Sequence, residues 1–353
     1  NTMTAGTGFP DIFYYDVERP EFIEANWVAD LSGAINWDNV EGFAKDFWTR
    51  GSAVYALGLE ASTNEIYYNV ARFEELGIEV PEDKQFTAAE FLDVCKTCRE
   101  AGYDPLGQPG NYWAGAQRFY KYILLHQLGS DKLEQYWLGD IPADDPDVLK
   151  AVAYVQEIMA VPALPTTFST MTLAEGHTYF HTQQKSCMFV VGSWYTGRAF
   201  VPPEDGGQPA DFRLSFLKYP EMPGGAGNNE HFSSVGGSLA VAEKSPNKDI
   251  ALDIVNFFAQ EKYGNLWMAN TGVQTGIKTN PATMPETPYP WYFEEYAKTH
   301  AGLDMYIHNL GLQSPEMKQA WLQVFNEGLP LSLITWDEAV QILEEARAAA
   351  GKK

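Results

Sequence analysis

The chain has 353 residues and a formal net charge of −23, from 47 acidic and 24 basic side chains. This length is typical of two domains rather than of one core. The negative charge would repel nucleic-acid phosphates and anionic lipids, so neither is an expected partner. No apolar run reaches the roughly 18 residues that a membrane helix needs.

The first half of the chain predicts strands and helices in alternation. Short apolar or alternating stretches predict strands at 11–15, 53–59 and 65–70. Apolar residues at helical spacing predict helices at 19–30, 71–77, 88–101, from 117 onward and at 144–160. Thr87 and Glu90 form a capping box for the helix at 88–101, and Gly77 ends the helix before it.

The second half continues this alternation. Strands are expected at 188–191, at 212–217 and within 231–241, and helices after Ser245, at 315–328 and at 335–351. Ser245 is the expected N-cap of its helix, with Pro246 at the first helical position. Thr335 and Glu338 form a second capping box. The alternation indicates an α/β protein with mainly parallel sheets.

The cysteines and the paired histidines are expected to be structural. Cys95 and Cys98 lie in the middle of one predicted helix, where a disulfide would be strained, and no second pair completes a zinc site. We therefore expect buried thiols, with Cys187 in the core at the start of a strand. His177 and His181 have helical spacing but no third ligand in view, so no metal is expected.

The sequence lacks the motifs of catalysis and of nucleotide binding. It contains no GxGxxG opening a βαβ unit, and no GxxxxGKS/T, GxSxG or HExxH. Aromatic residues make up 14% of the chain, which suits either a large core or a site for a polar, carbon-rich ligand. Ligands of α/β proteins bind beyond the carboxyl ends of strands. That rule and the aromatic loop before residue 117 indicate five places: Tyr15–Asp16, Ser62–Glu65, Tyr112–Trp113, Trp194–Tyr195 and Ser233–Gly237.

Five segments in order resemble the extracellular solute-binding proteins of ABC sugar importers, the family that includes maltose-binding protein. They are "PDIFYYD…NWVADLS", "EIYYNVARFEELGIEVPED…FTAAEFLDVCKTCREAG", "QQKSCMFVVGSWYTG", "GGSLAVAEKSPNKDIALDIVNFF" and "LITWDEAVQILEEA". Together they cover nearly the whole chain. Two segments depart from the family pattern: alanine replaces the tryptophan expected at residue 88, and Ser186-Cys187 replaces two alanines.

The resemblance implies a type II periplasmic-binding-protein clamp of two lobes, each a mainly parallel sheet flanked by helices. The first lobe would comprise 1–64 plus 238–304, and the second 65–237 plus 305–353. The chain would cross between the lobes near 64–69, 233–239 and 306–313, and a sugar bound between the lobes would close them. No cofactor is implied.

The chain enters its first strand almost at once, whereas members of this family begin earlier, with an export signal or a lipoprotein cysteine and a first strand–helix unit. We therefore expect the natural protein to have residues before Asn1. The expected location is outside the cytoplasm, either in the periplasm or lipid-anchored at the cell surface.

The resemblance also nominates ligand contacts. Trp194 matches a family tryptophan that stacks on a sugar ring, and an indole covers the apolar C–H face of a sugar well. Asp16 either accepts hydrogen bonds from sugar hydroxyls or caps the following helix. Tyr112 and Trp113 supply a second aromatic contact or pack under a helix. The remaining candidates are Glu18, Arg19, Ser62, Asn64, Glu65, Tyr195, Gly236, Gly237 and Trp321, of which Trp321 is the one expected mainly to fill the core.

Three functions remain open from the sequence. The first is a monomeric carbohydrate receptor that delivers a mono- or oligosaccharide to the permease of an ABC importer by lobe closure. The second is the same clamp binding a non-sugar solute such as a polyol or a glycerol-phosphate. The third is a glycoside-active enzyme, which would need two carboxylates roughly 5–10 Å apart; no such pair can be named, and the chain is expected not to be an enzyme.

Overall fold

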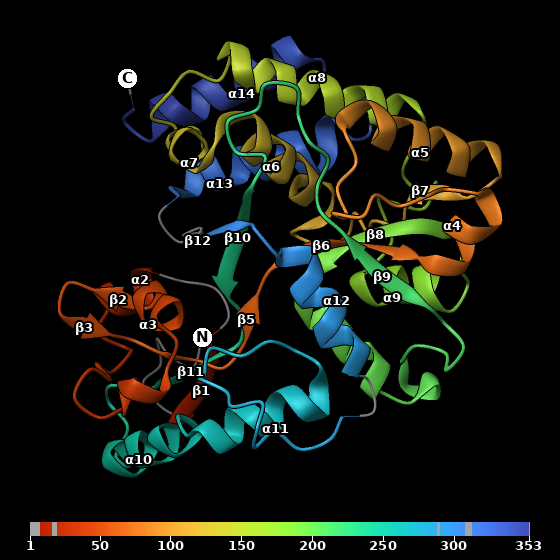
Figure 1. The fold of residues 1–353 in the computed structure, drawn as a ribbon. Coiled ribbons are helices and arrows are strands. Elements are labelled where there is room, and N and C mark those ends of the chain that lie inside the picture. Colours follow the sequence, from red (N-terminus) through yellow and green to blue (C-terminus); the bar gives the residue numbers. More distant parts are fainter. Residues whose placement is uncertain (1–7, 16–19, 288–289, 308–312, 353) are drawn as a thin grey trace.

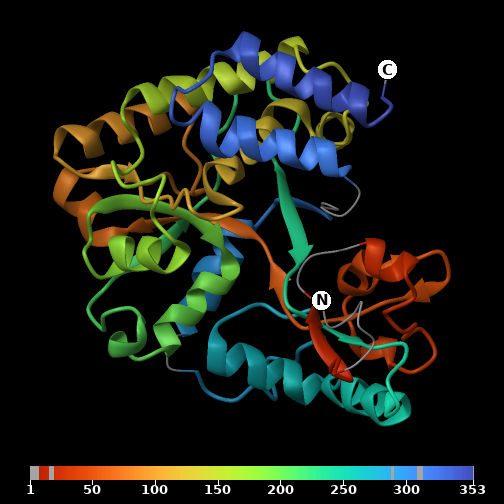
Figure 2. The same cartoon turned by 180° about the vertical axis from the view of Figure 1, so that it is seen from behind.

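A computed structural model describes residues 8–15, 20–287, 290–307 and 313–352. The chain forms two lobes joined by a narrow set of strands, as Figure 1 and the reverse view in Figure 2 show. Among the described residues, no helix combines the length and the apolar character that crossing a membrane requires. Three candidate ligand contacts, Asp16, Glu18 and Arg19, lie outside the described residues.

The first lobe contains a three-stranded sheet in the order β1 (Ile12–Tyr15), β11 (Ser238–Val241), β4 (Leu57–Gly58). Both neighbours of β11 run antiparallel to it. The other elements of this lobe are α2 (Pro20–Glu24), α3 (Gly42–Phe47), β2 (Thr49–Arg50), β3 (Ala53–Val54), α10 (Lys248–Phe258) and α11 (Glu261–Thr271), with a 3-10 turn at Trp37–Asn39. In its core, the rings of Tyr15 and Trp48 stack with centroids 4.6 Å apart.

The second lobe is built on a four-stranded sheet in the order β7 (Asp104–Leu106), β8 (Ser186–Gly192), β6 (Asn64–Asn69), β9 (Leu214–Leu217). Successive side chains of a strand point to opposite faces, so Ile66 and Tyr68 join one core while Tyr67 joins another. Helices cover the two faces: α4 (Val70–Leu76), α5 (Ala88–Glu100), α6 (Gly115–Leu128), α7 (Ser130–Leu138), α8 (Pro146–Ala160), α9 (Leu173–His181), α12 (Pro290–His300), α13 (Pro315–Trp321), α14 (Trp336–Ala349), the 3-10 helices η2 (Ser193–Phe200) and η3 (Pro203–Asp205), and a π-helix at Leu322–Gly328.

A third sheet lies between the lobes, in the order β12 (Asp304–Ile307), β10 (Glu230–Val235), β5 (Ala61–Ser62). Strand β5 leads through one residue into β6, and β10 leads through Gly236 and Gly237 into β11. These are the first two predicted crossings. The third falls partly on residues 308–312, outside the described part of the chain.

The two-lobed α/β clamp is confirmed, but the prediction of mainly parallel sheets is wrong. Among the described strands, β7 pairs parallel with β8 and β10 with β12, whereas β1, β4, β5, β6 and β9 all pair antiparallel. The antiparallel pairing of β6 and β8 follows from the way the chain crosses between the lobes. Strand β6 carries the chain away from the other lobe and β8 brings it back, so that Gly192 lies opposite Asn64.

Two helix boundaries also differ from the prediction. Helix α2 ends at Glu24 rather than near residue 30, and the left-handed Asn26 follows it at φ 56°. The helix expected to start at Ser245 begins at Lys248, because Asn247 takes the N-cap position and donates its backbone N–H to the Ser245 hydroxyl. The capping boxes at Thr87 and Thr335 are confirmed.

The lobe boundaries remain a prediction, with one segment worth reassigning. Helix α12 packs against β9, and its Tyr292 belongs to the core around Phe216. The expected division gave residues 238–304 to the first lobe, whereas this packing favours the second lobe for 290–300. The three cysteines are buried free thiols, as predicted.

Candidate functional site

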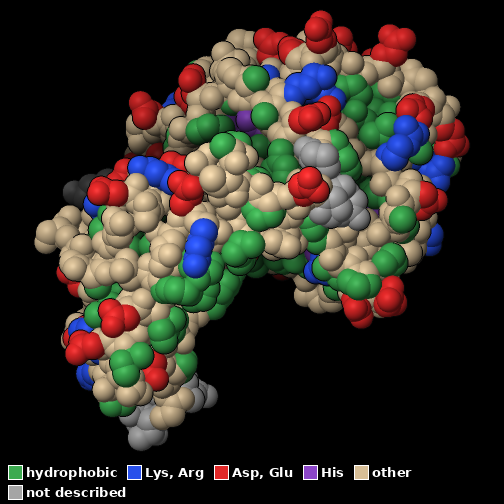
Figure 3. All heavy atoms as spheres, turned by 60° about the horizontal axis from the view of Figure 1, so that its bottom comes forward, with side chains coloured by type: hydrophobic (Ala, Val, Ile, Leu, Met, Phe, Trp, Pro, Cys, Tyr) green, Lys and Arg blue, Asp and Glu red, His purple; other side chains and the backbone are tan. Residues whose placement is uncertain are grey.

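A cleft of about 680 Å³ lies where the two lobes and the connecting strands meet. Figure 3 shows the surface hollowed between an arm and the larger body of the molecule, with hydrophobic side chains along the inner edge. Seven of the predicted residues line the cleft: Ser62, Asn64, Tyr112, Trp113, Trp194, Gly236 and Gly237. The structure thus brings together side chains that lie as far apart in the chain as residues 62 and 237.

Trp194 reaches the cleft from the 3-10 helix η2, directly after β8 ends at Gly192. A Cβ atom on Gly192 would lie 2.4 Å from the indole Nε1 of Trp194, so the glycine makes room for the ring. The other side of Trp194 packs against His177, with ring centroids 5.6 Å apart. The indole is therefore held at the edge of the core and is only partly buried.

Tyr112 and Trp113 form a second aromatic wall immediately before α6. Their rings meet edge to face with centroids 5.8 Å apart, and Trp113 is 49% exposed. Such exposure is unusual for an indole that only packs under a helix, and it leaves the ring free to contact a ligand.

Gly236 and Gly237 let two side chains of the first lobe approach closely. A Cβ on Gly237 would lie 2.3 Å from the hydroxyl of Tyr14, and one on Gly236 would lie 2.7 Å from Oε2 of Glu60. The backbone N–H of Gly237 donates to the same Glu60 oxygen at 2.9 Å. The two glycines therefore fix Glu60 and accommodate Tyr14 at the edge of the cleft.

Three predicted residues do not line the cleft. Tyr195 is fully buried in the aromatic core beside Trp194, and its hydroxyl lies 2.8 Å from Nδ1 of His181. Trp321 packs on Trp137 with centroids 4.5 Å apart, in the core as expected. Glu65 is 1% exposed and points away from the cleft, because it alternates with Asn64 along β6.

Glu65 instead forms a buried cluster with two histidines. Its Oε1 lies 3.1 Å from Nε2 of His300 and 3.9 Å from Nε2 of His231. Burial alone would raise the pKa of Glu65, but the two imidazoles lower it to about 2. One atom from each of these three side chains lies within 4.8 Å of the others, a donor set of the kind that binds zinc. His177 and His181 lie in the aromatic core, where burial lowers the pKa of each.

Several lining residues were not predicted. The most important are Tyr14, Glu60, Gln117, Arg118, Lys121, Trp137, Arg198 and Phe232. Two signals pointed to some of them. Tyr14 alternates with the buried Tyr15 on β1, and Gln117, Arg118 and Lys121 occupy one side of the first turns of the helix that follows Tyr112 and Trp113.

Two α/β lobes joined by crossing strands around an aromatic cleft define the class of solute-binding clamps. The chain belongs to the bacterial extracellular solute-binding protein family, whose model matches residues 2–265. No curated protein sequence matches the chain.

Solved structures of low sequence identity share the fold. One, from work on xylan utilization by the thermophilic bacterium Caldanaerobius polysaccharolyticus, is 20% identical with a TM-score of 0.83, over 98% of this chain and 87% of that one. A sugar transporter from Bacillus licheniformis in complex with stachyose is 16% identical with a TM-score of 0.72, over 98% and 87%. An ABC substrate-binding protein from Listeria monocytogenes in complex with cycloalternan is 15% identical with a TM-score of 0.73, over 100% and 88%.

Proposed function

We propose that this protein is the carbohydrate receptor of an ABC importer. The observation that carries the proposal is the cleft, in which Trp194, Tyr112 and Trp113 of one lobe face the same space as Tyr14 of the other. The family supports a solute-binding role, and the structural neighbours named above include complexes with stachyose and cycloalternan.

The side chains of the cleft suit a sugar. Flat aromatic rings cover the apolar faces of sugar rings at little cost in conformational entropy. Ser62, Asn64, Ser234 and Gln117 add hydroxyl and amide groups that can hydrogen-bond sugar hydroxyls. The volume of about 680 Å³ is within the usual range for small-molecule sites, roughly 300–1,000 Å³.

Transport follows from closure of the lobes. A sugar that contacts both walls stabilises the closed form, because it gains contacts there that the open form does not provide. The closed monomer then presents both lobes to the membrane permease. The proposed location is outside the cytoplasm, free in the periplasm or lipid-anchored.

Isothermal titration calorimetry tests the proposal directly. The panel comprises neutral xylo-, chito- and galacto-oligosaccharides together with acidic oligosaccharides. We expect micromolar or tighter binding of at least one member. If a protein that unfolds cooperatively binds none of them, the carbohydrate function is wrong. A polyol and glycerol-phosphate in the same panel test the non-sugar alternative. An assay for turnover of an aryl-glycoside tests the alternative that the protein is a glycoside-active enzyme.

A further inference from the structure

Three cationic side chains line the cleft of a strongly acidic protein. Arg118 and Lys121 come from α6, and Arg198 comes from η2. Among the described lining residues, Glu60 is the one carboxylate, and its Oε2 accepts the backbone N–H of Gly237. The cleft therefore has a local charge opposite in sign to the net charge of −23.

Within the described part of the chain, none of these cations lies at ion-pair distance from a carboxylate, although Glu134 of α7 attracts Lys121 from farther away. Arg118 is buried, with its guanidinium 5.6 Å from the centre of the Tyr112 ring. The Nζ atom of Lys121 lies 4.7 Å from the ring centre of Phe232 and 5.4 Å from that of Trp137. Aromatic faces attract cations only modestly and do not neutralise them.

Three other partly buried cations of this protein have ion-pair partners. Lys84 lies 3.0 Å from Glu295, Arg99 lies 2.5 Å from Asp104, and Arg347 lies 2.5 Å from Glu344. The cations of the cleft differ from these three in having no ion pair within the described part of the chain.

An unpaired, partly buried cation is unfavourable without a counter-charge. Burial, together with the charge of Arg118, lowers the pKa of Lys121 to about 7, and the carboxylate of Glu134 offsets only part of this effect. Arg118 and Lys121 are three residues apart on one helix, so both charges lie on the same face. A bound anion at this wall would relieve the desolvation of both groups.

We propose that the cleft takes an acidic saccharide, whose carboxylate or sulfate group binds at the wall formed by Arg118 and Lys121 of α6. The sugar rings then stack on Trp194 and on the Tyr112–Trp113 pair. Arginine suits this role because its planar guanidinium donates two parallel hydrogen bonds to a carboxylate. The proposal rests on the carbohydrate function and specifies the class of sugar.

Pairs of ligands that differ only in the acidic group separate its contribution to the affinity from that of the sugar rings. We would titrate trigalacturonate against its methyl ester, and a glucuronate-bearing xylo-oligosaccharide against the unbranched one; a sulfated disaccharide distinguishes sulfate from carboxylate. We expect the acidic member of at least one pair to bind ~10- to 100-fold more tightly, the range typical of a charge-assisted hydrogen bond. Binding should also take up protons near pH 8, because the bound anion raises the pKa of Lys121.

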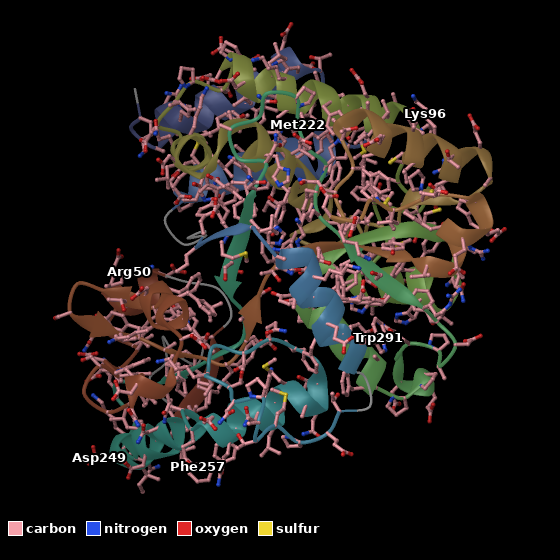
Figure 4. The ribbon with its side chains drawn as sticks, viewed as in Figure 1. Arg50, Lys96, Met222, Asp249, Phe257 and Trp291 are labelled. Atoms are coloured by element: carbon pink, nitrogen blue, oxygen red, sulfur yellow. The ribbon has the colours of Figure 1, made fainter. Side chains whose placement is uncertain are left out.

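A charge-matched variant pair tests the site. Lys121→Gln should remove most of this preference, measured as the ratio of the affinities for the acidic ligand and its neutral counterpart. Lys96→Gln is the control, because Lys96 projects from the outer side of α5, away from the cleft, and pairs with Asp93 (Figure 4). It removes the same charge and should leave the preference intact.

The outcomes distinguish the two proposals. Neutral members that bind as tightly as acidic ones would overturn the acidic-saccharide proposal and leave the carbohydrate receptor standing. An acidic preference that Lys121→Gln and Arg118→Gln both preserve would place the anion elsewhere and overturn the assigned site. Failure of every saccharide, neutral or acidic, would overturn both.

Discussion

Trp194 and Tyr195 are neighbours in the chain but lie in different environments. The indole of Trp194 borders the cleft, where Gly192 leaves room for it, while the phenol of Tyr195 is fully buried and lies beside His181. Their shared position past the end of a strand predicted both as ligand contacts, and the prediction for Tyr195 is wrong. That position alone does not separate the two residues, because the direction of each side chain is set by the 3-10 helix that follows β8.

We predict that Trp194→Ala weakens binding of the preferred saccharide about 30-fold, or roughly 2 kcal/mol, the loss typical of a central aromatic contact. The matched control is Trp291→Ala. Trp291 also packs at the edge of the aromatic core, from α12 (Figure 4), but it does not line the cleft. Calorimetry on both variants checks the prediction, and equal affinities for the two would remove Trp194 from the site.

The elements that cross between the lobes are tied together by the cluster of Glu65, His231 and His300. These residues belong to β6, β10 and α12, so the cluster links the strand entering the second lobe to the strand leaving it. Because Glu65 is 1% exposed, its negative charge is stabilised by the two imidazoles rather than by water.

Glu65→Gln should therefore lower the free energy of unfolding by on the order of 3 kcal/mol, as expected when one partner of a buried charged group is removed. Urea unfolding followed by circular dichroism measures the loss. Glu74→Gln is the control, because Glu74 pairs with Arg213 on the exposed surface, and it should change stability little. If both variants unfold at the same urea concentration, the cluster contributes no special stability.

Local sequence rules predicted the elements better than the site. Capping boxes at Thr87 and Thr335 and helical spacing located α5 and α14, since these signals act within a few residues. The antiparallel sheets were missed because strand direction depends on where the chain crosses between lobes. The placement of Glu65 depends on strand alternation starting from Asn64, and the cations of α6 depend on which side of that helix meets the first lobe.

The net charge of the whole molecule does not indicate the sign of the charge in the cleft. The net charge of −23 argues against nucleic acids and anionic lipids as partners, yet Arg118, Lys121 and Arg198 make the lining of the cleft positive. Net charge describes solubility and long-range repulsion, whereas recognition depends on the groups within the cleft.

We predict that the protein loses stability below about pH 6.5. Burial lowers the pKa of His126 and His181 to about 4 and that of His177 to about 3, whereas unfolded histidines titrate near 6.5. Between these values the unfolded state binds more protons, so stability falls as the pH falls. Urea unfolding at pH 7.5, 6 and 5 measures the slope, and His177→Phe should make it shallower. A flat profile over this range would contradict the burial of neutral imidazoles.

Closure of the two lobes on a saccharide is the central claim, and small-angle X-ray scattering tests it most directly. The radius of gyration would be measured without ligand and with a saturating concentration of the saccharide that binds most tightly in calorimetry. We predict that saturation lowers the radius of gyration of the wild-type protein, because the ligand contacts both walls of the cleft. An unchanged radius of gyration at a concentration that calorimetry shows to be saturating would contradict closure of the lobes on the ligand.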